Sequence, residues 1–118
     1  MAKVIITKKL EAEINKTFKK ESTKIFESMK NLEENPHKGK PVGQVSGILI
    51  KELKHGSYRF YFITDGFKIK MLQKEELTDL LIKFVRMSDK KSQQKVIDEI
   101  KIILRSLGEE GFNKEFLK

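Results

Sequence analysis

The chain has 118 residues, 38% of them hydrophobic, which is enough for one domain with a buried core. It contains no cysteine, so disulfides, thiolate metal sites and a cysteine nucleophile are excluded. No apolar run approaches the roughly 20 residues that cross a membrane, and residues 1–7 lack the apolar core of a signal peptide. We therefore expect a cytoplasmic protein with no membrane partner.

The net charge of +8 is unevenly distributed along the chain. Residues 38–70 carry seven basic and two acidic side chains, residues 83–95 carry five and one, and residues 8–34 are nearly neutral. One interpretation is a polyanionic partner, which includes RNA, DNA and an acidic protein. The other is a lysine-rich surface that maintains solubility, and charge alone does not decide between the two.

The first 47 residues predict a strand, two helices and a loop. The β-branched residues 3–7 predict the strand. Between residues 8 and 34 the apolar side chains recur at helical spacing: Leu10, Ile14, Phe18, Ile25, Met29 and Leu32. Residues 21–23 interrupt this pattern and predict two antiparallel helices. Asn35–Pro36 ends the second helix, and residues 36–47 read as a basic loop.

The second part of the chain predicts strands and one helix. The expected strands are residues 48–54, 57–64, 67–73 and 80–87. Two-residue turns are expected at His55–Gly56 and Asp65–Gly66, because glycine tolerates positive φ. Residues 89–107 predict a final helix ended by Gly108. Residues 108–118 are expected to form a loosely held tail, with Phe112 and Phe116 as candidates for docking on the body.

The expected fold is therefore a single α+β domain over residues 1–118. Its N-terminal strand and helical hairpin pack on a largely antiparallel sheet, and a C-terminal helix follows the last strand.

The two turns set a register for the predicted sheet, and the side chains then alternate between its faces. The predicted core face carries Phe60, Phe62, Ile69 and Met71. On the other face Glu52 is expected opposite Arg59. That face is expected to be exposed and basic, with the members Glu52, Lys54, Arg59, Tyr61, Lys68 and Lys70. Lys51 falls on the core side and has to reach a polar environment at an edge.

Arg59 has two interpretations in this register. It can form a cross-strand ion pair with Glu52, which is worth at most about 1 kcal/mol at a surface. Alternatively, Glu52 holds the guanidinium in place for a bidentate contact with a phosphate.

Five short motifs follow one another in a characteristic order along the chain: Asn35-Pro36, Gly39-Lys40-Pro41, Glu52-Leu53-Lys54-His55-Gly56, Tyr58-Arg59-Phe60 and Phe84-Val85-Arg86 leading to Lys90. This order resembles the RelE/ParE toxin superfamily, and within it the HigB-type, phage-derived branch. The resemblance covers about residues 1–107 and implies a small RelE-like fold. Met87 and Ser92 stand where that branch usually has lysine and proline.

The resemblance implies the toxin component of a type II toxin–antitoxin system that acts as a ribosome-dependent mRNA endoribonuclease. The implied partners are a cognate antitoxin protein, mRNA and the ribosome. The alternatives are a catalytically inactive homologue that binds RNA or protein, and a ParE-like gyrase inhibitor. No cofactor is expected, because the sequence has no carboxylate cluster for two-metal catalysis. His37 and His55 fall in a loop and a turn and are not placed as an acid–base pair.

The predicted catalytic residues are mostly cations, because charge develops on the phosphate during RNA cleavage. Arg59 would bind the scissile phosphate beside Lys54, and Arg86 and Lys90 would approach from the last strand and the loop after it. Glu52 would orient Arg59 or act as a base. Arg86 is expected at the end of the apolar face formed by Leu80, Ile82 and Phe84. The predicted RNA contacts are Lys38, Lys40, Tyr61, Lys68, Lys70 and Lys91.

Overall fold

The computed structural model describes residues 1–117, with side chains described for residues 1–107. A five-stranded sheet forms the middle layer, in the order β1-β5-β4-β3-β2. The strands are β1 (Lys3–Ile6), β2 (Lys40–Val45), β3 (Ile48–His55), β4 (Tyr58–Asp65) and β5 (Leu81–Asp89). The helices are α1 (Lys8–Phe18), α2 (Ser22–Lys30), α3 (Gly66–Met71) and α4 (Gln93–Leu117). Short 3-10 turns occupy residues 19–21, 31–33 and 74–76.

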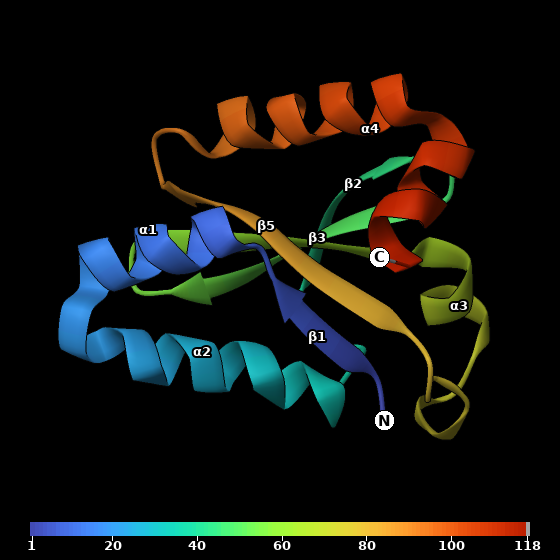
Figure 1. The fold of residues 1–118 in the computed structure, drawn as a ribbon, viewed down its shortest axis with the longest axis horizontal. Coiled ribbons are helices and arrows are strands. Elements are labelled where there is room, and N and C mark those ends of the chain that lie inside the picture. Colours follow the sequence, from blue (N-terminus) through green and yellow to red (C-terminus); the bar gives the residue numbers. More distant parts are fainter. Residues whose placement is uncertain (118) are drawn as a thin grey trace.

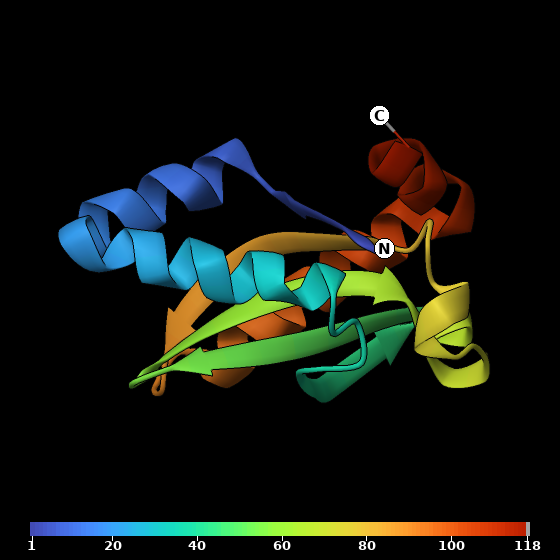
Figure 2. The same cartoon turned by 90° about the horizontal axis from the view of Figure 1, so that it is seen from below.

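Helices cover both faces of the sheet (Figures 1 and 2). The α1–α2 hairpin lies on one face and α4 lies on the other. β1 runs parallel to β5, and the remaining neighbours are antiparallel. This arrangement confirms the expected α+β fold with a helical hairpin, a largely antiparallel sheet and a C-terminal helix. No helix among the described residues is both long and apolar enough to cross a membrane.

The helical hairpin forms where the apolar spacing predicts it. The Thr7 hydroxyl caps α1 by accepting from the backbone N–H of Leu10 at 3.3 Å. The chain reverses through the 3-10 turn at residues 19–21, whose first residue, Lys19, has φ 50°. The expected split into two helices is confirmed, but the break lies at residues 19–21 rather than 21–23. The Ser22 hydroxyl, in the first turn of α2, donates to the carbonyl of Ile14 at 3.2 Å and ties the two helices together.

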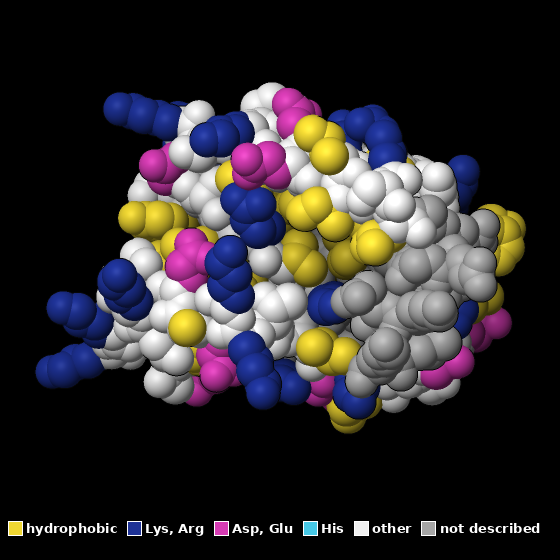
Figure 3. Space-filling model, turned by 45° about the horizontal axis from the view of Figure 1, so that its top comes forward, with side chains coloured by type: hydrophobic (Ala, Val, Ile, Leu, Met, Phe, Trp, Pro, Cys, Tyr) yellow, Lys and Arg dark blue, Asp and Glu magenta, His cyan; other side chains and the backbone are white. Residues whose placement is uncertain are grey.

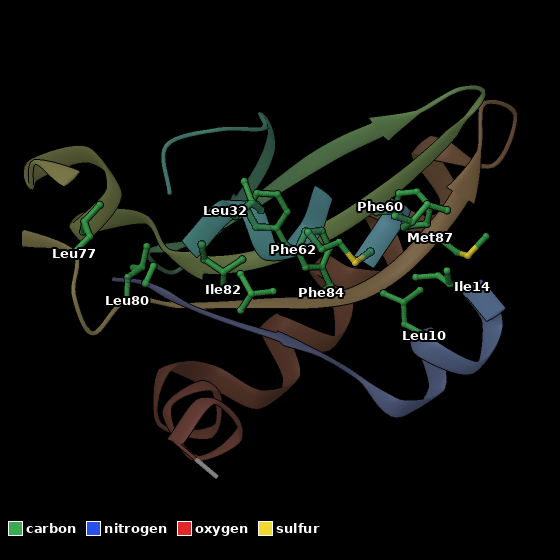
Figure 4. Packing of buried hydrophobic residues seen from close by; sticks show 14 residues of the cluster. Leu10, Ile14, Leu32, Phe60, Phe62, Leu77, Leu80, Ile82, Phe84 and Met87 are labelled. Atoms are coloured by element: carbon green, nitrogen blue, oxygen red, sulfur yellow. The ribbon is translucent and has the colours of Figure 1, made fainter. Parts of the chain in front are cut away.

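Two apolar layers result, one on each side of the sheet. The layer under the hairpin, shown in Figure 4, includes Leu10, Ile14, Leu32, Phe60, Phe62, Ile82, Phe84 and Met87. The layer under α4 includes Val45, Ile48, Ile50, Tyr61, Ile63, Val96, Ile97, Ile100 and Leu104. The middle strands are therefore apolar on both faces, as in a sheet that is covered on both sides.

The first correction concerns residues 36–47, which were expected to form a loop. Residues 40–45 form strand β2, which pairs with β3. Ser46 and Gly47 connect the two strands as a two-residue hairpin turn with φ values of 49° and 83°. Positive φ at both central residues is the geometry of a type I′ turn, and the Ser-Gly pair carried this signal in the sequence.

The second correction concerns residues 67–73, which were expected to form a strand. Residues 66–71 form helix α3, because the Asp65 carboxylate accepts from the backbone N–H of Lys68 at 3.0 Å and caps a helix. Aspartate serves as an N-cap as readily as it begins a hairpin. Neither Ile69 nor Met71 lies on a strand face. Ile69 is partly buried and packs against the apolar layer under the hairpin, whereas Met71 is 59% exposed, so its assignment to the core is wrong. Phe60 and Phe62 lie in the core as predicted.

The third correction shifts the β3–β4 register. The turn residues are Gly56 and Ser57, not His55 and Gly56, so Arg59 lies opposite Lys54 and Glu52 lies opposite Tyr61. The shift moves each pairing by two positions and leaves every side chain on its predicted face. Lys51 is buried on the core side as expected, and its ammonium donates to the carbonyl of His37 at 2.9 Å.

The last helix begins at Gln93 rather than at residue 89, since β5 continues to Asp89. It also continues through Gly108 to Leu117, so the expected helix end at Gly108 is wrong. The packing of the Phe112 and Phe116 side chains lies outside the described residues.

Phe62 and Phe67 lie on either side of Asp65–Gly66, where a hairpin turn was expected and helix α3 begins, and they test this fold. We expect Phe62→Ala to lower the free energy of unfolding by about 3–5 kcal/mol, because Phe62 is fully buried. Phe67→Ala should cost at most about 0.5 kcal/mol, because Phe67 is 67% exposed on α3. Urea denaturation followed by circular dichroism measures both values. A loss at Phe67 as large as that at Phe62 would contradict the assignment of residues 66–71 to a surface helix.

Candidate nucleic-acid interface

Polar side chains line up across the sheet at the end near the Gly56–Ser57 turn. One row joins Lys40, Glu52, Tyr61 and Arg86 in register across four strands. The next row joins Lys54, Arg59 and Ser88. Because side chains two residues apart share a face, both rows point to the face that α4 covers. We call Glu52, Lys54, Arg59, Tyr61, Arg86 and Ser88 the polar end of the sheet.

This face was expected to be exposed, and that expectation is wrong. Tyr61 is completely buried, Glu52 is 3% exposed and Arg59 is 8% exposed. The reason is that Ile50 and Ile63 lie on the same face and are buried against the apolar side of α4, which covers this face of the sheet. Only the margin of the polar end reaches solvent: Lys54 is exposed and Arg86 is half-buried.

Arg86 reaches the polar end through a β-bulge. In β5, Phe84 pairs with Phe62 and Arg86 pairs with Tyr61, so Val85 is an extra residue. A bulge reverses the alternation of side chains after it. Arg86 was expected on the face of Ile82 and Phe84, and it lies instead on the α4 face.

The Arg86 guanidinium is held there by a residue of α4. Its Nη2 donates to Oε1 of Glu99 at 2.9 Å, between side chains that are 39% and 40% exposed. An ion pair this exposed contributes at most about 1 kcal/mol, so it positions Arg86 more than it stabilises the fold.

Arg59 is only partly satisfied. Its Nη1 donates to the carbonyl of Ser57 at 3.0 Å, which holds the guanidinium beside the exposed β3–β4 turn. Its Nε is buried and makes no hydrogen bond within the described part of the chain. The predicted ion pair with Glu52 does not form. Glu52 Oε2 is itself buried without a hydrogen-bond partner there.

Two buried groups of opposite charge therefore lie in adjacent rows without pairing. Leaving a buried charged group unsatisfied costs free energy. Arg59 also lies directly across from Lys54, and like charges on facing residues repel each other. A guanidinium without a carboxylate partner is chemically suited to bind an anion such as a phosphate, but the Nε of Arg59 is buried from solvent.

Tyr61 and Ser88 form the neutral part of the polar end. The Tyr61 hydroxyl and Ser88 Oγ are 2.8 Å apart in a buried hydrogen bond. Burial raises the pKa of Tyr61, and the bond to Ser88 opposes that effect only in part. The phenol therefore stays protonated at neutral pH and can donate a hydrogen bond but not act as a base.

A shallow groove of about 360 Å³ opens beside the polar end. Its polar lining consists of two cations, three carboxylates and three hydroxyl side chains: Arg86, Lys95, Glu13, Asp89, Glu99, Ser88, Ser92 and Tyr58. The hydroxyls and cations are of the kind that contacts phosphate and sugar groups in nucleic-acid complexes, whereas the carboxylates repel phosphate. The sequence did not point to Ser88, Ser92 or Lys95, because their convergence depends on the bulge at Val85 and on the start of α4.

The connection from β5 to α4 carries two of the predicted cations. Lys90 and Lys91 are both exposed there, directly after the polar end. The Asp89 carboxylate accepts from the backbone N–H of Ser92 at 2.8 Å and fixes this turn. That hydrogen bond lowers the pKa of Asp89, so the turn is maintained at neutral pH.

The remaining predicted RNA contacts divide between the two ends of the sheet. Lys40 begins edge strand β2 in register with Glu52, and Lys38 precedes it in an exposed loop. Lys68 and Lys70 were expected on the sheet face but lie on α3, after the far end of β4, about 20 Å from Arg59 along the strand. Lys68 pairs with Asp79 at 3.8 Å. The structure therefore does not bring these two lysines to the polar end.

No group of three or more potential metal ligands occurs among the described residues. The Arg, Lys, Tyr and Ser side chains of the polar end can stabilise charge and form hydrogen bonds. Comparisons with protein-family models, with curated proteins and with solved structures found no match.

The raised pKa of Tyr61 predicts a loss of stability at high pH. The unfolded chain ionises this phenol near pH 10 while the folded chain still holds the proton. The stabilising contribution is thus complete below about pH 10 and falls as the pH rises further. Tyr61→Phe should cost about 1 kcal/mol at pH 8, because Ser88 loses its partner, but its stability should fall less steeply above pH 10.

Urea denaturation from pH 8 to 11 measures the difference between the two proteins. Burial lowers the pKa of Lys51, but Lys51 titrates in both proteins and its effect cancels in the comparison. Parallel pH profiles would show that Tyr61 ionises as freely in the folded chain as in the unfolded one.

Proposed function

We propose that the protein binds RNA at the polar end of the sheet and acts in the cytoplasm as the toxin of a type II toxin–antitoxin system. Its proposed activity is metal-independent cleavage of mRNA on the ribosome. The observation that carries the proposal is the Arg59 guanidinium, whose buried Nε has no partner within the described residues. It lies between Lys54 and Ser88 in one row of the sheet.

The polar end supplies cations for a phosphate but no evident base. Arg59 and Arg86 can stabilise charge on a phosphate during attack by the neighbouring 2′-hydroxyl. Tyr61 is protonated and is not a base. Glu52 is 3% exposed, so a substrate has little access to its carboxylate, which disfavours Glu52 as the base. A site of this composition would depend on the ribosome to orient the RNA, because proximity and orientation contribute much of the rate.

Met87 replaces the lysine of the resembled branch, and this difference concerns packing rather than catalysis. It is 9% exposed and packs in the apolar layer under the α1–α2 hairpin. The lysine usual at this position would face the same layer, so its absence removes no cation from the polar end. Lys90 and Lys91 follow at the surface and supply positive charge beside the groove.

One observation favours a second candidate function, a catalytically inactive RNA-binding module. Arg59 is 8% exposed and α4 covers the face on which it lies, so an RNA phosphate has little access to its guanidinium. A binding module needs only the exposed cations at and beside the polar end, namely Lys54, Lys90, Lys91 and Lys95. The two candidates differ in whether RNA is cut.

Cleavage of mRNA in a translating extract separates these candidates. Arg59→Ala and Arg86→Ala should each lower the cleavage rate by about 10²-fold or more, because each removes a cation from the phosphate. Arg59→Lys should also be damaging, since lysine lacks the planar bidentate fork. Arg105→Ala is the matched control, because Arg105 is exposed on α4 and lines none of the grooves at the polar end.

Circular dichroism establishes that each variant folds. Equal cleavage by wild type, Arg59→Ala and Arg86→Ala would contradict the site. If folded wild type binds RNA and leaves it intact on translating ribosomes, the binding module is the function.

Binding itself should depend steeply on salt, because phosphate contacts release counterions. Lys54→Ala and Lys90→Ala should each weaken binding to a single-stranded RNA and lower the slope of log K against log salt by about 0.7. Lys70→Ala should leave both quantities unchanged, because Lys70 is on α3 at the far end. Fluorescence anisotropy over 50–300 mM salt measures the slopes. An equal effect of Lys70→Ala would place the RNA elsewhere.

A further inference from the structure

The edge of β5 is only partly covered by its neighbour. β5 has nine residues, whereas β1 has four, which pair with Leu81–Phe84. The last hydrogen bond joins the N–H of Thr7 to the carbonyl of Phe84 at 3.1 Å, and the chain then turns into α1. Among the described residues, no strand pairs with residues 85–89 on this side. We call this segment the open edge.

The open edge forms the floor of a groove between two helices. Lys9, Ala12, Glu13 and Lys16 of α1 form one wall, and Glu99, Ile102 and Ile103 of α4 form the other. The groove has a volume of about 770 Å³. It shares Glu13, Arg86 and Glu99 with the 360 Å³ groove beside Ser88, so the two are continuous along β5.

The α4 wall carries two apolar side chains that face solvent. Ile102 is 62% exposed and Ile103 is 53% exposed, and Leu107, one turn further along α4 and outside the groove lining, is 40% exposed. These side chains lie outside the stripe of α4 that packs on the sheet. Figure 3 shows hydrophobic side chains gathered in the middle of this face, with charged side chains around them. A contiguous exposed apolar surface of this kind marks an interaction site.

Two features together select the kind of partner. A strand edge presents unpaired N–H and C=O groups, which an extended segment of another chain can pair. After the bulge at Val85, residues 86–89 pair regularly with β4, so their outer edge has regular strand geometry. RNA would satisfy neither the backbone edge nor the isoleucine wall.

The charges around the groove select an acidic segment. Arg86 and Glu99 pair with each other. Of the other charged lining residues, Lys9, Lys16 and Lys95 are basic and Glu13 and Asp89 are acidic, which leaves an excess of one positive charge. The positive excess complements aspartate or glutamate on the partner.

We propose that the open edge accepts an extended segment of a partner protein, in which apolar side chains that pack on Ile102 and Ile103 alternate with acidic ones. The segment adds a strand to the sheet beside residues 85–89. Its occupation would also cover Arg86 and Ser88. That consequence, and the identification of the partner as an antitoxin, rest on the proposed function, whereas the strand pairing does not.

A display library of random 12-residue peptides, selected on the full chain, tests this surface. Selection is run in parallel on Ile103→Lys and on Met71→Lys, which is a matched control because Met71 is 59% exposed on α3. Peptides with alternating apolar and acidic residues should be enriched on wild type and on Met71→Lys. Their affinity for Ile103→Lys should be lower by about tenfold or more, since a central apolar contact becomes a charge.

Amide hydrogen exchange locates the bound peptides. Exchange at residues 85–89 should slow when a selected peptide is added, and it should not slow in Ile103→Lys. The proposal is overturned if no peptide is enriched, if Ile103→Lys and Met71→Lys behave alike, or if a single-stranded RNA rather than a peptide protects residues 85–89. These readouts need no catalysis, so they can succeed or fail independently of RNA cleavage.

Discussion

The packing of α4 across the second face of the sheet is the interaction on which the rest of the structure depends. The middle strands carry Phe60 and Phe62 toward the helical hairpin and Tyr61 and Ile63 toward α4, so neither face can be left in water. α4 satisfies this requirement with its apolar stripe. Because it crosses the whole face, it also buries the polar groups at one end, and Arg59 and Glu52 lose most of their hydration.

That burial changes what the polar end can do. Removing water strengthens the field of a cation and raises the cost of leaving it unpaired. Arg59 remains unpaired at Nε, and its neighbours are Lys54, which repels it, and Ser57, whose carbonyl holds it. An anion that reached this guanidinium would relieve both penalties. Perturbed and unsatisfied groups gather at functional sites as well as in structural networks, which is why the mutations of Arg59 are judged by cleavage and folding together.

The sequence predicted the elements that form from local periodicity. The spacing of Leu10, Ile14, Ile25 and Met29 was sufficient for the helical hairpin, and alternation in β4 placed Phe60 and Phe62 correctly. It failed where one residue type supports two structures, as at Asp65, which caps α3 instead of beginning a hairpin. The cover over the polar end was not visible either, because a pattern of alternation does not say which face a distant helix will occupy.

The bulge at Val85 shows why the sequence pattern alone could not predict the position of Arg86 in the site. Without the extra residue Arg86 would share the face of Phe84 and point into the layer under the hairpin, where an unpaired guanidinium is costly. With it, Arg86 joins Tyr61 and Ser88 on the α4 face. The pairing with β1 ends at the neighbouring residue, Phe84. The change of face and the start of the open edge therefore coincide, so Arg86 of the polar end and the β5 side of the groove are built from the same half of β5.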